Sequence, residues 1–321
     1  MIDTLIIGKD SKFGLTKDFL LLRDALQASG VGGEIKVRGI RDRPLWKRLI
    51  GAKEAKQAVH IERAFPRWFS AAERHFLIPN QERFPHRHLP RLRRIDTVLA
   101  KSHHAAEIFR SHGAHVEYLG FTSEDQRDPS VTRDWKAILH LAGGSTLKGT
   151  EDILTLWSRH PEWPRLTLVQ REYLGPLPVP PNVTLISGYV TDEEVRRIQN
   201  AHGIHLCPSR AEGWGHHLVE SMSTAALVIT TDAPPMNEHL SADSAIMVPY
   251  ARTEPRRIGM CFFVDLPAFE NAIATAISMP ESEKMALGQK ARVRFEEIDR
   301  GFHERLSAIF GPLPVPMSVA V

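Results

Sequence analysis

Short apolar runs alternate along the chain with segments whose apolar residues return every three or four positions. The first run, residues 2–8, predicts a buried strand. Residues 16–29 predict a helix because Phe19, Leu22 and Leu26 share one helical face. A helical region is expected from Ala268 onward, and further apolar runs predict strands over residues 76–78, 95–100, 114–119, 138–141, 166–169, 183–186, 204–207, 227–231, 245–248 and 262–264.

A polar stretch that contains a proline, residues 123–134, interrupts this alternation and is typical of a linker between domains. Strands and helices alternate on both sides of it. This predicts the α/β class, with two doubly wound, Rossmann-like domains that face each other across a cleft. We predict an N-terminal domain over residues 1–130, a C-terminal domain over residues 131–300 and a loose tail over residues 312–321.

The composition is that of a soluble globular protein, with 42% hydrophobic and 25% charged residues. No apolar stretch approaches the length that spans a bilayer, and Lys9 ends the first apolar run too early for a signal peptide. We therefore expect a cytoplasmic protein. Cys207 and Cys261 lie far apart in apolar surroundings, which indicates reduced core residues rather than a disulfide or a metal site.

The charge is divided unevenly between the two predicted domains. Residues 1–130 hold 23 Lys and Arg against 16 Asp and Glu, a net charge of +7, whereas the remainder holds 18 against 22, a net charge of −4. Within residues 37–57, apolar Leu45, Trp46 and Leu49 interleave with basic residues, which are Arg41, Arg43, Lys47 and Arg48.

This segment fits a helix on the inner face of an anionic membrane, and it equally fits a solvated helix that packs its apolar side inward. A second basic run, residues 87–94, lies close by in the sequence. No base-reading motif accompanies the charge, so no nucleic-acid partner is expected.

The most informative stretch is residues 203–239. Glu212 falls in a loop, Glu220 falls in the following helix, and Gly213 and Gly215 delay the start of that helix. Free N–H groups at the helix start favour a phosphate, and ionised glutamates accept hydrogen bonds from hydroxyl groups. The pattern predicts a sugar nucleotide. A solvated helix-face glutamate remains the alternative for Glu220, because the apolar residues of this helix lie on the opposite face.

Glu212-Gly213-Trp214-Gly215 followed by Glu220 resembles the E-x7-E motif of retaining glycosyltransferases with the GT-B fold, family 4 in particular. The flanking PSR and ITTDAPPMNEH segments strengthen the resemblance. It implies a hexosyltransferase that moves a sugar from a nucleotide-diphosphate sugar to a hydroxyl acceptor, in polysaccharide or glycolipid synthesis. It also implies that the helix near residues 302–310 packs back on the first domain.

The resemblance also assigns roles to residues. Glu212 and Lys148 would be catalytic: Glu212 orients the sugar, and Lys148 stabilises the leaving diphosphate. Family members commonly carry an arginine where this chain has Gly143, so Lys148 acts largely alone or with an arginine from elsewhere. Glu220 would bind the ribose diol. The other donor-side candidates are Gly213, Trp214, Gly215, His216, Gly144 and, for the base, Tyr189 and Val190.

Acceptor-side candidates come from the N-terminal domain, because loops at the carboxyl ends of parallel strands line the ligand crevice. Polar clusters follow two of the predicted strands there, and a loop with one glycine follows the first strand. The candidates are Gly14, Asn80, Glu82, Lys101 and His103. A saccharide or a lipid-linked acceptor is expected.

No cofactor is predicted beyond the nucleotide sugar, for which a UDP- or GDP-sugar is favoured. The chain has no Asp-x-Asp pair, and its paired histidines lack zinc-like spacing, so no metal site is expected. Two other functions remain open on the same fold. They are a sugar-nucleotide 2-epimerase and a non-catalytic module that binds a nucleotide sugar or a membrane.

Overall fold

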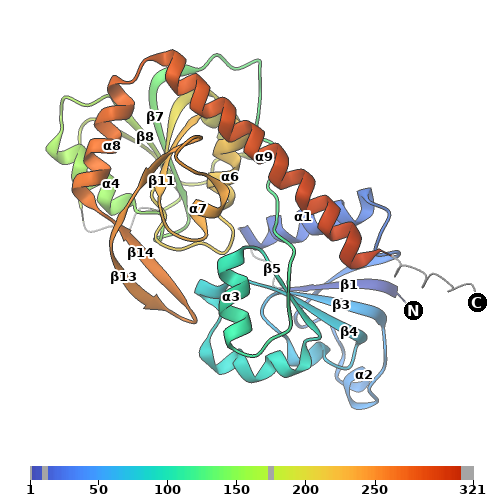
Figure 1. The fold of residues 1–321 in the computed structure, drawn as a ribbon. Helices are drawn as coiled ribbons and strands as arrows, with labels where there is room; N and C mark the ends of the chain where they lie inside the picture. The colour runs from blue at the N-terminus through green and yellow to red at the C-terminus, as the bar shows by residue number, and fades with distance from the viewer. Residues whose placement is uncertain (1, 9–13, 173–176, 312–321) are drawn as a thin grey trace, which may run out of the picture.

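The computed structural model describes residues 2–8, 14–172 and 177–311, with only the backbone for residues 14–16. The first unit contains a parallel six-stranded sheet in the order β2-β1-β3-β4-β5-β6 (Figure 1). Its strands are β1 (Ile2–Gly8), β2 (Ile35–Gly39), β3 (Ala55–Glu62), β4 (Ala72–Pro79), β5 (Thr97–Ala100) and β6 (Val116–Tyr118). Leu5 and Ile7 pack on one face and Ile6 on the other, as in a sheet covered on both faces.

The second unit contains a parallel six-stranded sheet in the order β12-β11-β10-β7-β8-β9. The chain winds outward from β7 in one direction and from β10 in the other, so β7 and β10 form the topological switch point, where ligands bind in such sheets. The strands are β7 (Asp134–Gly143), β8 (Leu166–Gln170), β9 (Val183–Ile186), β10 (His202–Cys207), β11 (Leu227–Thr231) and β12 (Ile246–Val248).

Helices cover the sheets, and an antiparallel hairpin, β13 (Tyr250–Arg256) and β14 (Gly259–Val264), extends from the second unit toward the first (Figure 1). The helices of the first unit are α1 (Gly14–Ala28), α2 (Leu45–Leu49) and α3 (His103–Ser111), with 3-10 turns over Pro66–Trp68, Gln81–Arg83 and His86–Arg94. Those that follow are α4 (Thr150–Arg159), α5 (Asp192–Ala201), α6 (His216–Ser223), α7 (Met236–His239), α8 (Leu266–Ser278) and α9 (Glu281–Phe310).

The two units share one hydrophobic cluster, and α9 runs along both of them (Figure 1). Phe295 lies in this cluster with Met222 of α6, while Phe310, at the other end of the helix, packs on Phe76 of β4 with ring centroids 5.1 Å apart. Burial of these large side chains stabilises the contact between the units. None of the described helices combines the length and apolar character needed to cross a bilayer.

The structure corrects the prediction for residues 37–57. In place of one basic helix, this segment contains the end of β2, the five-residue helix α2 and the start of β3. Pro44 holds an extended conformation before α2, and Gly51 takes a left-handed conformation after it, which ends the helix early. β2, β3 and β13 are also absent from the predicted strands, and the predicted tail, 312–321, lies outside the described residues.

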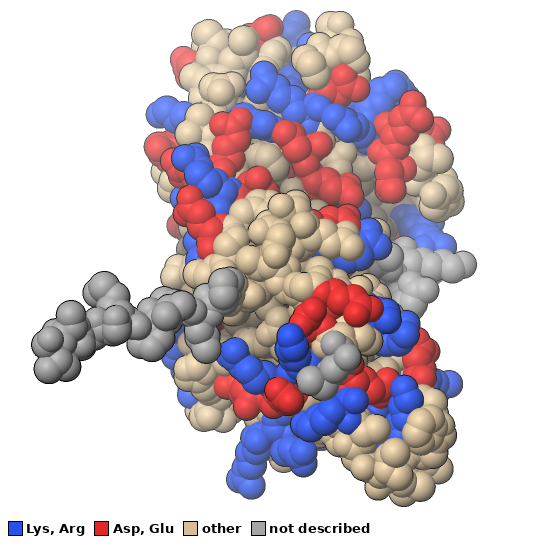
Figure 2. All heavy atoms as spheres, turned by 90° about the vertical axis from the view of Figure 1, so that its right-hand side faces the viewer, with Lys and Arg blue, Asp and Glu red and all other residues tan. Residues whose placement is uncertain are grey.

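Figure 2 shows that acidic residues interleave with lysines and arginines over the visible face of both units. Arg43 is fully buried, where its guanidinium pairs with Glu54 and donates to the carbonyl of Ala52. It therefore cannot contact a membrane, contrary to its place in the predicted basic surface. Leu45, Trp46, Leu49 and Ile50 of the α2 region are all exposed, so the apolar side of this helix does not pack inward.

Candidate functional site

The loop after β10 and the loop after β7 meet at the switch point of the second sheet. Gly215 caps α6 in a left-handed conformation with a φ of 96°, which a side chain at this position would disfavour. Gly149 caps α4 with a φ of 73°, and a Cβ there would lie 2.3 Å from the carbonyl oxygen of Pro208. The two glycines allow the loops that carry Lys148 and Glu212 to approach each other closely.

Lys148, Glu212 and His217 form a compact cluster. The Lys148 ammonium lies 2.6 Å from Glu212 Oε1 and 2.9 Å from His217 Nδ1. A lysine ammonium only donates, so His217 Nδ1 accepts, and Nε2–H donates to Ser209 Oγ at 3.1 Å. Burial, followed by the charge of Lys148, lowers the pKa of His217 well below its usual value. His217 is therefore a neutral residue that orients the ammonium.

A second buried histidine supports this cluster from β7. His140 Nδ1 donates to the carbonyl of Leu206 at 2.8 Å, and its Nε2 accepts from the Thr150 hydroxyl at 2.9 Å. Burial lowers the pKa of His140 to about 4, so the ring stays neutral and keeps this tautomer at neutral pH. The hydrogen bonds tie the start of α4, and with it Lys148, to β10.

Glu220 is buried, with 4% of its surface exposed. Its Oε1 lies 2.9 Å from the Lys17 ammonium of α1, and Oε2 accepts from Gln199 at 3.5 Å. The solvated helix-face alternative for Glu220 is therefore wrong: the first unit and α5 cover that face of α6. A buried carboxylate with one partner from the other unit can exchange that partner for ligand hydroxyls.

The first unit contributes a second ion-pair network directly opposite α6. Asp18 Oδ2 lies 2.6 Å from the Lys101 ammonium, and Asp18 Oδ1 lies 2.9 Å from His216 Nε2. Burial acts to raise the pKa of Asp18, but Lys101 and His216 outweigh it and hold this pKa below its usual value. Lys101 also donates to Asn80 Oδ1 at 3.2 Å. The network joins three of the residues predicted for the site across the two units.

Two further contacts join the end of β4 to the Glu212 loop. Gln81 Nε2 donates to the carbonyl of Glu212 at 2.7 Å, and a Cβ on Gly213 would lie 2.3 Å from Asn80 Oδ1. Glu82 is buried, and its Oε2 has no hydrogen-bond partner among the described residues. Burial, and then the nearby charge of Glu212, raises the pKa of Glu82 to about 7.

The remaining donor-side candidates are Trp214, Tyr189, Val190 and Gly144. Trp214 is buried and donates to Ser123 at 3.2 Å, which braces the loop. Tyr189 is 82% exposed, and Val190 packs in a small cluster with Leu139. Gly144 lines a pocket beside the Lys148 loop.

Two acceptor candidates are not joined to the Lys148 cluster. The ring of His103 stacks on Tyr118 at 3.9 Å, and its backbone N–H donates to Glu238. Gly14 is the first residue of α1, and the loop before it, residues 9–13, lies outside the described residues.

Sequence reasoning missed several residues of the site: Lys17, Asp18, Gln81, Ser209 and His217. Two local signals exist: Gln81 lies in the polar cluster that also holds Asn80 and Glu82, and His217 follows the donor-side candidate His216. Within residues 2–8, 14–172 and 177–311, no three His, Cys, Asp or Glu side chains form a group that could hold a metal ion. Metal independence of the reaction stays a prediction.

The family model described as glycosyl transferases group 1 matches residues 179–254, which include Glu212 and Glu220. A search of curated proteins finds no match. Among solved structures, the chain is similar to HepE of Anabaena in complex with UDP-glucose, at 13% identity and a TM-score of 0.71, over 96% of this chain and 99% of that chain.

Two other solved structures are similar over nearly their full length. Sucrose-phosphate synthase from Thermosynechococcus elongatus has 12% identity and a TM-score of 0.71, over 97% of this chain and 98% of that chain. A glycosyltransferase from Rickettsia africae ESF-5 has 12% identity and a TM-score of 0.71, over 96% of this chain and 97% of that chain. The chain therefore has the GT-B fold, with two Rossmann-like units, as the sequence predicted.

Proposed function

We propose that this protein is a retaining glycosyltransferase that moves a sugar from a nucleotide-diphosphate sugar to a hydroxyl acceptor without a metal ion. One observation carries the proposal: Lys148, Glu212 and the start of α6 converge at the switch point of the second sheet, opposite polar groups of the first unit. The match to the group 1 glycosyl transferases and the fold shared with HepE, whose structure holds UDP-glucose, support it.

The donor lies over the second unit in this proposal. The diphosphate binds at the N-terminus of α6, where N–H groups and the helix dipole favour an anion, and Lys148 exchanges Glu212 for the phosphate nearest the sugar. Glu220 accepts hydrogen bonds from the ribose diol in place of Lys17. Tyr189 and Val190 would contact the base, and UDP- and GDP-sugars are the favoured donors.

The acceptor lies over the first unit, near the carboxyl ends of β4 and β5. Its hydroxyl oxygen bonds to the anomeric carbon on the face from which the nucleotide leaves. The bond from that carbon to the phosphate oxygen breaks, and the hydroxyl proton passes to the departing phosphate. Glu212 orients the sugar hydroxyls, and Lys148 stabilises the charge on the leaving group.

Proton NMR of donor turnover tests this reaction. UDP-glucose and GDP-mannose are incubated with the protein in excess EDTA, with water or a simple glycoside as acceptor. The product is expected to form first in the anomeric configuration of the donor, at the same rate with and without EDTA. Inversion would contradict the retaining mechanism, and activity that Mg²⁺ restores would contradict metal independence. An epimeric donor formed without transfer would favour the epimerase.

Substitutions of the two glutamates are expected to separate nucleotide binding from turnover. Glu220→Ala should weaken binding of the nucleoside diphosphate by about 1.5–3 kcal/mol, the range for a hydrogen bond to a charged group. Glu212→Ala should lower turnover while the nucleotide still binds as in the parent. Calorimetric titration of UDP into each variant measures the difference. Parent-like UDP affinity in Glu220→Ala would remove the ribose role of Glu220.

We propose further that an anionic membrane presents the acceptor, with α2 docked on it. Trp46 and Leu49 are 59% and 78% exposed, and Arg41 and Arg48 lie in the same segment without a carboxylate partner among the described residues. Apolar side chains that enter a bilayer beside cations that face its headgroups are typical of peripheral attachment. Lys47 pairs with Glu54, so it contributes less than the sequence suggests.

Co-sedimentation with phosphatidylglycerol vesicles at low and high salt tests the docking. Parent protein should bind at low salt and dissociate as salt rises, because each cation near the surface contributes about 1 kcal/mol that salt screens. Trp46→Ser with Leu49→Ser should weaken binding by about tenfold or more, whereas Met285→Ser, an exposed apolar side chain on α9, should not. Folded parent that stays in solution at low salt would leave a soluble acceptor.

A further inference from the structure

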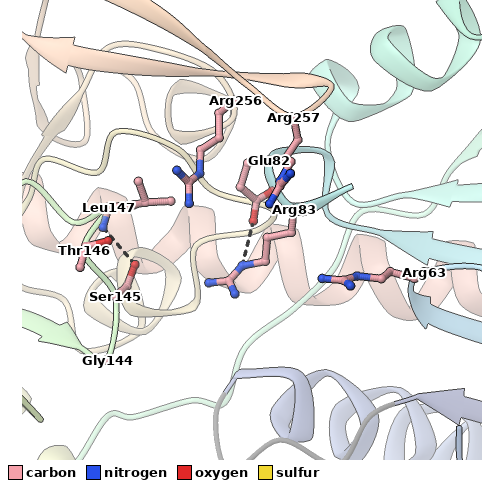
Figure 3. Close-up of a pocket in the computed structure, with 9 residues that line it drawn as sticks. All are labelled: Arg63, Glu82, Arg83, Gly144, Ser145, Thr146, Leu147, Arg256 and Arg257. Atoms are coloured by element: carbon pink, nitrogen blue, oxygen red, sulfur yellow. Dashed lines mark hydrogen bonds and ion pairs between the residues drawn. The ribbon is translucent and has the colours of Figure 1, made fainter. Parts of the chain in front are cut away.

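A pocket of about 310 Å³ lies between the two units, beside the loop that ends at Lys148. Figure 3 shows side chains of both units around it. We call it the arginine pocket, and it is lined by Arg63, Glu82, Arg83, residues 144–147, Arg256 and Arg257. A neighbouring pocket of about 310 Å³ shares Arg63 and Arg257 and adds Arg87.

The β13–β14 hairpin packs against the first unit next to its tip, which places Arg256 and Arg257 beside that unit. Ile258 packs on the cluster that contains Leu77 and Phe84. A Cβ on Gly259 would be crowded, because it would lie 3.1 Å from Gln81 Cγ and 3.3 Å from the backbone nitrogen of Glu82. Arg256 and Arg257 precede this contact directly, so the hairpin places two cations from the second unit beside two from the first.

The positive charge in this pocket is poorly compensated. Of the described residues that line it, four are arginines and one is acidic. Glu82 pairs with Arg83 at 3.6 Å, and Arg63 pairs with Glu62 at 3.1 Å. Neither Arg256 nor Arg257 forms an ion pair with a described carboxylate, and the buried Nε of Arg63 has no hydrogen-bond partner among the described residues. Like charges held together repel each other, so an anion would stabilise this arrangement.

The orientation of the side chains suits one particular kind of anion. Figure 3 shows Arg256 reaching down from the hairpin toward Leu147, and Arg63, from the loop after β3, pointing toward Arg83. Guanidinium groups donate in a planar fork that matches the oxygens of a phosphate. We propose that the arginine pocket binds a phosphate group carried by the acceptor.

This inference rests on the proposed function, because it assigns the phosphate to the acceptor rather than to the donor. The Lys148 ammonium points to Glu212 and His217, and neither these residues nor Glu220 lines the arginine pocket. The pocket borders residues 144–147, which directly precede Lys148 and include the donor-side candidate Gly144, and it also touches Glu82 after β4, where the acceptor is expected. A phosphate here would hold the acceptor next to the transferred sugar.

Calorimetric titration of inorganic phosphate and of glucose 6-phosphate, into protein saturated with UDP, tests the inference. Arg256→Gln with Arg257→Gln should raise the Kd for both probes by about tenfold or more, since each lost guanidinium removes charged hydrogen bonds. Arg252→Gln is the matched control: it lies on the same hairpin, pairs with Glu254 and does not line the pocket. The Kd for UDP should be the same in all three proteins.

Unchanged phosphate binding in the double variant would overturn the inference, and so would a loss of UDP affinity that parallels the loss of phosphate affinity. The second result would assign the arginines to the donor diphosphate. Failure of every nucleoside diphosphate to bind the parent protein is a separate outcome, which contradicts the proposed function. In that case the phosphate titrations, repeated without UDP, would still compare phosphate binding in the parent, the double variant and Arg252→Gln.

The same double variant distinguishes two sources of the phosphate. A soluble sugar phosphate predicts tighter binding of glucose 6-phosphate than of inorganic phosphate, with vesicle binding unchanged by the substitutions. A lipid-borne phosphate predicts that Arg256→Gln with Arg257→Gln lowers co-sedimentation with phosphatidylglycerol vesicles, whereas Arg252→Gln does not. Either result supports a phosphate in the arginine pocket.

Discussion

Replacing Lys148 with alanine is expected to lower turnover by about 100- to 1,000-fold, or about 3–4 kcal/mol of transition-state stabilisation. The ammonium lies 2.6 Å from Glu212, and the neutral His217 and the Gly149 turn hold it there. It is the one lysine of the glycine-rich turn at the switch point, so no neighbouring lysine can take over its role. Steady-state kinetics on the donor, with nucleotide binding measured separately, give the effect.

A control separates catalysis from folding, because Lys148→Ala also leaves the Glu212 carboxylate without its ion pair. Lys284 is a buried lysine that donates to the carbonyl of Trp135 and belongs to none of the site contacts. Lys284→Ala should lower stability without lowering turnover. If folded Lys148→Ala turned over at near the parent rate, Lys148 would have no part in the mechanism.

The second large effect concerns Glu82 and the pH dependence of stability. Its pKa is raised from 4.5 to about 7 in the folded protein, chiefly by burial and then by Glu212. The folded state therefore binds this proton more tightly than the unfolded state. The contribution of Glu82 to stability is fully present below about pH 4.5 and is lost as the pH rises through about 7. Between pH 5 and pH 8 the loss amounts to about 2–3 kcal/mol.

Glu82→Gln removes the titrating group, so the difference in unfolding free energy between variant and parent isolates this contribution. Urea unfolding at pH 5 and pH 8 should show the variant gaining about 2–3 kcal/mol relative to the parent over this range. Other titrating groups are common to both proteins and cancel in the difference. Equal pH dependence in the two proteins would show that Glu82 is ionised at an ordinary pKa.

Much of the fold could be predicted because each strand of a parallel sheet that is covered on both faces is mainly apolar. Residues 2–8, 204–207 and 227–231 are such runs, and each is a strand in the structure. β2 was not predicted because it is an edge strand whose central residues are exposed, so it lacks a buried apolar run. β3 was not predicted because Lys56 and Gln57, its second and third residues, make the run look polar until Ala58.

The part of the candidate site that short segments form could also be predicted from the sequence. The glycines around Glu212 and the turn at Lys148 are features of short segments, and the structure brings both segments to the switch point. Asn80 and Lys101 of the first unit could be read from polar clusters after its strands, but the pairing of residues across the two units left no signal. Lys17 lies 203 positions from Glu220, and Gln81 lies 131 positions from Glu212. Periodicity along α6 assigned Glu220 to a polar face, but a contact between units buries that face.

A thermal-shift screen with UDP-, GDP-, dTDP- and ADP-sugars tests the central claim most directly, because it needs no knowledge of the acceptor. At about one hundred times its Kd, a donor should stabilise the folded protein by about 2.7 kcal/mol. We expect at least one donor, a UDP- or GDP-sugar first of all, to raise the Tm of the parent and to lose most of that effect in Glu220→Ala. If none of the four shifted the Tm of folded parent protein, the chain would not be a nucleotide-sugar-dependent glycosyltransferase.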